Sequence, residues 1–175
     1  DLSKKFEMEI GGGHNFRGSS YLSMNQLGLT ARFHLNNRWN ISASAAYGFN
    51  QFTDDAKRLF DKEQLLPDVS YIKGRANLLL GFHPFYGKFR LSMDSVLYFD
   101  QYVNIGPGVV RTQYDDFIAG VAQVGFVFWF GHHWSTRVGL DNEFFNEVRA
   151  DKGKSTFAYD AVGHLSVGYV FGGDT

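Results

Sequence analysis

The chain of 175 residues contains no cysteine and only three prolines, and its formal net charge is −1. The absence of cysteine excludes disulfide bonds, thiolate zinc sites and an N-terminal lipid-modified cysteine. A charge this close to zero disfavours nucleic acid as a partner and leaves no basic tail to recruit a membrane surface. The longest nearly apolar run, residues 121–130, is too short for a membrane-spanning helix. Because no leader-like stretch opens the chain, we expect any secretory signal to be already removed.

Aromatic residues (17%) and glycines (20 residues) are abundant, which is typical of an all-β protein. The stretch LGLTARFHL at residues 27–35 alternates strictly between apolar and polar side chains. A period of two predicts a strand with one apolar and one polar face. Eight such segments follow one another and predict a single domain over residues 1–175. The predicted strands are residues 6–13, 24–35, 39–49, 71–83, 88–100, 117–130, 134–145 and 157–171.

The connections between these segments alternate in length. The short connections are residues 36–38, 84–87 and 131–133, and the long ones are 14–23, 50–70, 101–116 and 146–156. Short connections therefore fall at one end of the sheet, together with both chain termini. This pattern predicts an antiparallel up-and-down meander of eight strands that closes into a barrel.

The apolar faces of the eight segments contain no Asp, Glu, Lys or Arg, whereas the opposite faces combine charged residues with Gly, Ser and Ala. A soluble barrel needs charged side chains on its outer face, and small residues suit a narrow interior. Most segments also exceed the roughly 9–11 residues that a tilted strand needs to cross a bilayer. The sequence therefore predicts a transmembrane β-barrel with its apolar face toward lipid and its charges in the lumen.

The charges of the polar faces are nearly balanced, which allows an internal network of ion pairs. We expect Glu7 or Glu9 to pair with Arg32, because the first two segments are neighbours. A structural plug of salt bridges is the favoured interpretation, and a narrow gated path for water or ions is the functional alternative. The predicted lumen network consists of Glu7, Glu9, Arg32, Lys73, Arg75, Arg90, Asp94, Arg137, Asp141, Glu143 and Asp160. Asp100 is a further acidic residue of the polar faces.

Aromatic residues of the apolar faces gather at two heights, as in the two girdles of an outer-membrane barrel. The girdle near the short connections comprises Phe33, Trp39, Phe82, Phe89, Phe130, Trp134, Tyr169 and Phe171. The girdle near the long connections comprises Tyr47, Phe49, Phe99, Phe144, Phe157 and Tyr159.

Three motifs invite a chemical interpretation, and each has a simpler explanation. His132 and His133 point to opposite faces of a strand and have no Cys or acidic neighbour, so we assign no metal site. The glycines at residues 11–13 lack the Lys-Ser/Thr of a phosphate loop. His14 with Ser19 or Ser20 is similar to barrel enzymes that modify lipid A, but no acidic third member is found. We therefore predict no catalytic residue, no cofactor and no enzymatic activity.

The whole chain resembles in architecture the small eight-stranded outer-membrane proteins, such as the OmpA transmembrane domain and OmpX. A nearer resemblance, to the outer membrane β-barrel domain proteins of myxobacteria and related bacteria, rests on PFYGKF (84–89), FDQYVNIGPGV (99–109) and GFVFWFGHHWSTRVGLDNEFF (125–145). It implies a porin-like or envelope role without catalytic residues. The final YVF at 169–171 is similar to the aromatic signal read by the barrel assembly machinery. Residues 172–175 follow it, so we expect the native chain to continue.

Together these features predict an integral protein of a Gram-negative outer membrane with periplasmic termini. Its expected role is that of an anchor or an interaction scaffold with long extracellular loops. A small-bore porin-like channel is the alternative, followed by a lipid-A-modifying enzyme and a soluble lipocalin-like binder. The expected partners are outer-membrane lipid and lipopolysaccharide, the barrel assembly machinery during insertion, and an envelope protein.

Overall fold

The computed structural model describes residues 2–16, 22–52, 72–90, 96–113, 115–131, 133–148 and 155–172. Nine strands lie within these ranges. They are β1 (Phe6–Asn15), β2 (Leu22–His34), β3 (Trp39–Phe52), β4 (Ile72–Phe82), β5 (Tyr86–Arg90), β6 (Val96–Thr112), β7 (Asp116–Phe130), β8 (Trp134–Val148) and β9 (Ser155–Phe171). None of the described segments forms a helix long and apolar enough to cross a membrane.

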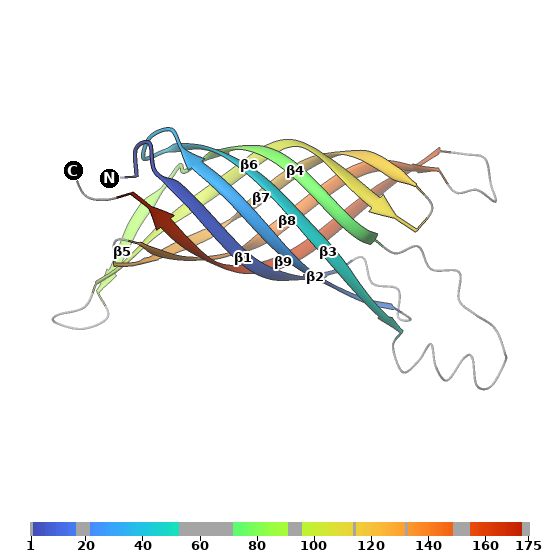
Figure 1. Ribbon diagram of the computed structural model, residues 1–175, viewed down its shortest axis with the longest axis horizontal. Helices are drawn as coiled ribbons and strands as arrows, with labels where there is room; N and C mark the ends of the chain where they lie inside the picture. Colours follow the sequence, from blue (N-terminus) through green and yellow to red (C-terminus); the bar gives the residue numbers. More distant parts are fainter. Residues whose placement is uncertain are drawn as a thin grey trace.

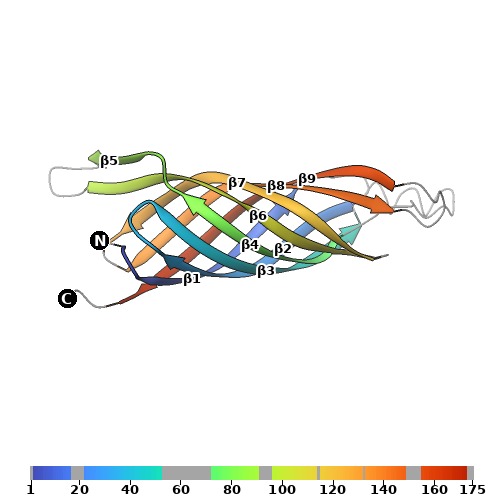
Figure 2. The same cartoon turned by 90° about the horizontal axis from the view of Figure 1, so that it is seen from above.

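The strands form one antiparallel sheet in the order β4-β3-β2-β1-β9-β8-β7-β6-β5 (Figure 1). An additional pairing of β4 with β6 closes the sheet into a barrel of eight strands and leaves β5 outside the circle. The two chain ends lie at the same end of the barrel as the β2–β3 and β7–β8 connections (Figures 1 and 2). The predicted eight-stranded antiparallel up-and-down barrel is thereby confirmed.

The predicted strand at residues 88–100 is wrong. The barrel strand at this place is β6, whose later part pairs with β4 (Phe82 opposite Val103) and whose first part pairs with β5 (Tyr86 opposite Asp100). Pro84 cannot donate a ladder hydrogen bond and marks a one-residue shift of register instead of the predicted turn at 84–87. The predicted long connection at 101–116 is also wrong, since β6 continues to Thr112 and β7 begins at Asp116.

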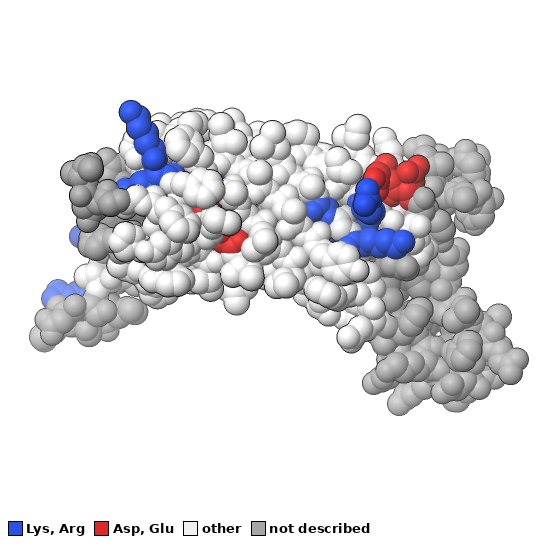
Figure 3. Space-filling view, viewed as in Figure 1, with Lys and Arg blue, Asp and Glu red and all other residues white. Residues whose placement is uncertain are grey.

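The barrel has its apolar side chains on the outside. In β1, Ile10 is 55% exposed while Glu7 is 0% exposed, and in β8 Leu140 is exposed while Arg137 is buried. The charged side chains in Figure 3 lie mostly toward the two ends of the visible face, and other residues cover most of the surface between them. The alternation therefore places apolar side chains on the outer surface and charged side chains in the lumen, the reverse of the arrangement in a soluble barrel.

A bulge at the start of β4 reverses two predicted side-chain directions. The register of β4 against β6 shifts between Ile72 and Gly74. Ile72, predicted to face lipid, is 4% exposed inside the barrel, and Lys73, predicted in the lumen, is exposed. The extra residue of a bulge changes the phase of the alternation, which the period-of-two rule does not include.

Part of the lumen is apolar. Buried side chains of β4 and β6–β9 form an apolar cluster at and toward the barrel end opposite the termini. Its members are Ile72, Leu79, Val110, Phe117, Ala119, Val121, Phe145 and Ala158. The Phe117 and Phe145 rings stack with centroids 6.2 Å apart. Filling by side chains is the expected state of an eight-stranded barrel.

Candidate functional site: the charged lumen

Two glutamates and two arginines meet in the half of the lumen nearer the termini, and we call these four residues the inner cluster: Glu7 and Glu9 of β1, Arg32 of β2 and Arg137 of β8. Glu9 Oε1 lies 2.9 Å from Arg32 Nε and 2.9 Å from Arg137 Nε. Glu7 Oε2 lies 2.6 Å from Arg137 Nη2 and 3.6 Å from Arg32 Nε. The predicted pairing of Arg32 with the first strand is present, and the charges of the four residues balance.

Small residues of β9 allow β1 and β8 to interact across the strand between them. Gly168 pairs with Glu9 on one side and with Ser135 on the other. A Cβ added at Gly168 would lie 2.7 Å from Glu7 Oε1 and 2.9 Å from Glu9 Cγ, a separation that real Cβ atoms do not show. The glutamates therefore occupy the volume that a side chain at residue 168 would need.

Further polar and aromatic groups contact the inner cluster. His34 Nε2 lies 2.9 Å from Glu7 Oε2, Ser135 Oγ also donates to Glu7, and Arg32 Nη1 donates to Asn40 Oδ1 over 2.9 Å. The Arg137 guanidinium carbon lies 5.6 Å from the Tyr102 ring centroid and 5.7 Å from that of Trp129. Rings at this distance stabilise a buried cation through their quadrupoles.

A second group of charges, which we call the outer cluster, lies farther from the termini. It consists of Arg75 of β4, Glu143 of β8 and Asp160 of β9. Arg75 Nη1 is 3.0 Å from Glu143 Oε2, and Arg75 Nη2 is 3.1 Å from Asp160 Oδ2. Asp160 Oδ2 also accepts a 2.8 Å hydrogen bond from Asn15 Nδ2. One guanidinium thus joins β4 to two carboxylates on the opposite wall.

Asp141, His164 and Tyr102 form a chain of polar contacts in the lumen. Asp141 Oδ1 is 2.8 Å from His164 Nδ1, and His164 Nε2 is 2.8 Å from the Tyr102 hydroxyl. Tyr102 fell within a predicted loop, so sequence reasoning missed it. The alternation of apolar and polar residues over 96–112 was the available signal, and the turn-like composition around Pro84 and Gly106–Gly108 obscured it.

Asp100 lies on the first part of β6, the part that pairs with β5, and its carboxylate has two neighbours near the termini end of the lumen. Trp129 Nε1 donates to Asp100 Oδ2 over 2.8 Å, and His83 Nδ1 lies 3.6 Å from the same oxygen. The Asp100 side chain therefore contacts His83, which directly follows β4, and Trp129 of β7.

A cavity of about 70 Å³ lies in the lumen beside β1–β3. At about 10–15 Å³ per water, it has room for on the order of five water molecules. Its charged lining residues from the two clusters are Glu9, Arg32, Arg137 and Arg75. Small residues of β1, β2 and β3 also line it: Gly11, Gly12, Gly28, Thr30, Ser42, Ser44, Ala45 and Ala46.

The structure does not bring every predicted lumen residue into these clusters. Lys73 is exposed because of the bulge, and Arg90 is exposed because β5 extends beyond the closed barrel. Asp94 lies outside the described residues. The remaining predicted members, Asp141 included, are buried in the lumen.

The residues considered for chemistry have ordinary surroundings. His14 Nδ1 lies 2.8 Å from Asn25 Oδ1, and His133 Nδ1 lies 3.2 Å from the Val170 carbonyl and its ring stacks on Tyr169. Ser19, Ser20 and His132 lie outside the described residues. Within the described ranges, no three His, Asp or Glu side chains converge in a way that could hold a metal ion.

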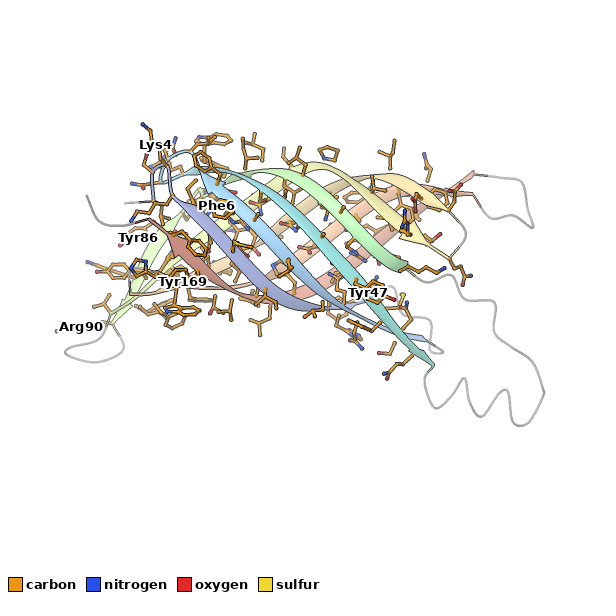
Figure 4. All side chains as sticks on the ribbon, viewed as in Figure 1. Lys4, Phe6, Tyr47, Tyr86, Arg90 and Tyr169 are labelled. Carbon is orange, nitrogen blue, oxygen red and sulfur yellow. The ribbon has the colours of Figure 1, made fainter. Side chains whose placement is uncertain are left out.

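The predicted aromatic girdle near the termini lies on the outer surface. Trp39 contacts Phe82 with centroids 4.7 Å apart, and Tyr169 lies 5.1 Å from Trp134 and 5.0 Å from Phe171. Figure 4 shows Tyr169 and Phe6 toward the termini end and Tyr47 of the second predicted girdle farther along the barrel. Phe33 and Phe130 are exposed on the same surface, and Phe89 lies on β5, outside the closed barrel.

Comparison with solved structures identifies the architecture. The N-terminal β-barrel domain of Pseudomonas aeruginosa OprF matches with a TM-score of 0.54 and 12% identity, over 97% of this chain and 98% of that one. A de novo designed transmembrane β-barrel matches with a TM-score of 0.53 and 9% identity, over 98% of both chains. The chain has the fold of a transmembrane β-barrel of the bacterial outer-membrane type.

The outer membrane protein OprG of Pseudomonas aeruginosa gives a similar result, with a TM-score of 0.51 and 14% identity over 98% of both chains. No family model and no curated protein sequence matches this chain. A designed barrel matches this chain as well as the natural barrels do, so the likeness concerns the fold alone. The role of the protein must therefore be argued from its lumen and its surface.

Proposed function

We propose that this transmembrane β-barrel is an anchor and interaction scaffold of a Gram-negative outer membrane, with a lumen that does not conduct. The inner cluster is the observation that supports the closed lumen. Its four charged side chains come from β1, β2 and β8, are at most 5% exposed, and contact one another within the lumen. The apolar cluster of β4 and β6–β9 fills a second level. Side chains thus occupy the space that ions would need.

We further propose that the termini are periplasmic and that the opposite end meets lipopolysaccharide and an envelope protein. Strand connections in outer-membrane barrels are short on the periplasmic side. Here the β2–β3 and β7–β8 connections share the termini end, while residues 53–71 join β3 to β4 at the other end. Insertion by the barrel assembly machinery is proposed from the aromatic last strand, and kinship with the myxobacterial family from the three sequence motifs alone.

Planar-bilayer recording of the folded barrel tests the closed lumen. We expect no conductance steps above background from the native chain. The double variant Glu9→Ser, Arg137→Ser removes one charge of each sign from the inner cluster, and we expect it to produce small steps. Steps of similar size in native and variant proteins would contradict the plug. Migration on a gel with and without heating checks that both are folded barrels.

A small-bore channel is the second candidate, and the internal cavity is the observation that favours it. A smaller cavity of about 10 Å³ lies farther along the same wall, and Gln26 and Arg75 line both. Conductance of the native chain that falls when Ser44 is enlarged to leucine would support this candidate. The primary proposal includes no enzymatic activity, so lipid A mass spectra are expected to be the same with and without the protein.

A further inference from the structure

A two-stranded arm extends the barrel wall beyond the end where the termini lie. It consists of β5 and the first part of β6, which pair from Tyr86 opposite Asp100 to Arg90 opposite Val96. β4 ends at Phe82, and the β5 strand that follows it pairs with β6 alone. The sheet is therefore no longer closed along the arm. Figures 1 and 2 show the arm as a continuation of the wall that does not fold over the mouth of the barrel.

The two faces of the arm differ in chemistry. Lys88 and Arg90 share the face that continues the lumen side, together with Tyr86, Val96 and Tyr98. Tyr86 is the ladder partner of the inward-facing Asp100, and side chains two residues apart on a strand point to the same face. Phe89, Leu97 and Phe99 share the other face, which continues the outer surface of the barrel. Both basic side chains therefore point away from the row formed by Phe89, Leu97 and Phe99.

The apolar face of the arm is continuous with the lipid-facing surface. The Phe89 and Phe99 rings stack at 4.6 Å with an interplanar angle of 13°. Phe99 in turn lies 6.3 Å from Phe126 and 6.4 Å from Phe128, both on β7 of the closed barrel. Phe89 is nevertheless 54% exposed. An exposed row of aromatic residues that continues a lipid-facing surface indicates that the row also faces lipid.

Glycine at residue 87 keeps this face flat. A Cβ at Gly87 would collide with the ring of Phe99, which lies directly over that residue from the neighbouring strand. Covering of a strand glycine by a cross-strand aromatic ring is a known way to stabilise a sheet edge. The ring of Phe99 thus covers β5 and extends the apolar surface without a step.

We propose that the β5–β6 arm lies on the membrane, with Phe89, Leu97 and Phe99 among the lipids of the leaflet nearer the termini and Lys88 and Arg90 toward water. The occupant of the apolar face is the lipid surface itself. This inference requires insertion of the barrel in a membrane but not a closed lumen. Aromatic side chains at the boundary of the acyl chains hold a barrel at a defined depth, so the arm acts as a lateral stop.

The absence of cysteine makes a site-specific label straightforward. Phe89→Cys and Lys88→Cys variants carry an environment-sensitive nitrobenzoxadiazole label on opposite faces of β5. The barrel is reconstituted in phosphatidylcholine vesicles that contain a nitroxide on the acyl chain. We expect quenching of the label at residue 89 to be at least threefold stronger than at residue 88. Leu97→Cys and Tyr98→Cys repeat the comparison on β6 with the Phe89 ring intact.

A label at Leu140→Cys, on the outer face of β8, reports membrane insertion of the barrel independently. Strong quenching at residue 140 with equal, weak quenching at residues 88 and 89 would overturn the proposal and leave the membrane barrel intact. A label at residue 89 that is shielded from water but unquenched by the nitroxide lipid would also overturn it, because a protein contact would then cover the arm. Loss of quenching at all positions would instead contradict membrane insertion.

Discussion

Replacing Arg137 with methionine tests whether the inner cluster holds the barrel together. The guanidinium is 1% exposed and contacts both Glu7 and Glu9. Its removal leaves two buried carboxylates with Arg32 as their remaining cation in the cluster. Removing one partner of a buried ion pair costs about 3–5 kcal/mol, since the desolvated charge stays behind. We expect a loss of this size in the free energy of unfolding.

The measurement is urea unfolding in detergent micelles, followed by tryptophan fluorescence and by migration on unheated gels. Trp129 is a suitable reporter, because its ring lies 5.7 Å from the Arg137 guanidinium carbon. With a denaturant slope of about 2–3 kcal/mol per molar urea, the midpoint should fall by roughly 1–2.5 M. Adding Glu7→Gln restores the charge balance of the cluster, so the double variant should recover a large part of the loss.

The matched control is Arg111→Met at the tip of the β6–β7 hairpin. Arg111 Nε lies 2.7 Å from Asp116 Oδ1, a pair as short as those of the lumen, but the arginine side chain is 66% exposed. Exposed pairs contribute little because water and salt screen them, so this variant should keep the native midpoint. Equal midpoints for Arg137→Met, Arg111→Met and the native chain would refute the stabilising role of the cluster.

Two further pairs of variants test the lumen. Gly139→Ala places a Cβ against the Tyr102 hydroxyl and should cost about 1–3 kcal/mol by overpacking, whereas Gly120→Ala, with nothing within 4 Å of its Cβ, should stay within about 1 kcal/mol of native stability; urea midpoints compare them. Arg75→Met leaves two buried carboxylates without their guanidinium and should cost about 3–5 kcal/mol, whereas Lys73→Met, on the exposed side of the bulge, should keep the native midpoint. Equal losses in either pair would contradict the assigned side-chain directions.

Alternation of apolar and polar residues was sufficient to predict most of the barrel. In β1–β3 and β7–β9 the alternation is unbroken. Once one residue of such a strand is assigned to the lumen or the lipid side, the direction of every other side chain in that strand follows. The lumen position of Arg32 and its contact with β1 follow from this alternation and from the adjacency of the first two strands. What the sequence pattern supports, in other words, is the direction of each side chain within an uninterrupted strand.

Interruptions of the ladder were beyond that reasoning. The bulge between Ile72 and Gly74 and the shift of register at Pro84 each add one residue to one strand of a pair. Such an extra residue reverses the faces of the residues beyond it, and the composition of the segment gives no sign of it. The sequence predicts a short connection at residues 84–87, whereas Pro84 lies between β4 and β5 where the register shifts, a position that tolerates proline. The missed β5–β6 arm explains the misplaced strand 88–100 and the wrong lumen position of Arg90. It also explains why Phe99, predicted in the girdle near the long connections, lies instead toward the termini, opposite Gly87 and Phe128.

Small residues on a lumen face do not by themselves indicate an open bore. Beneath the inner cluster, the space above Gly168 is taken by Glu7 and Glu9 from the neighbouring strand. Along Gly28, Ser42 and Ser44 on β2 and β3, by contrast, the cavity remains, because the long side chains nearby are held elsewhere. Arg32 pairs with Glu9 of the adjacent strand, and Arg75 pairs with Glu143 and Asp160. The distinction depends on which strand supplies the large charged residues. In this barrel β1, β2, β4 and β8 supply them, so side chains fill the lumen at the inner cluster and leave the cavity beside the small residues of β2 and β3.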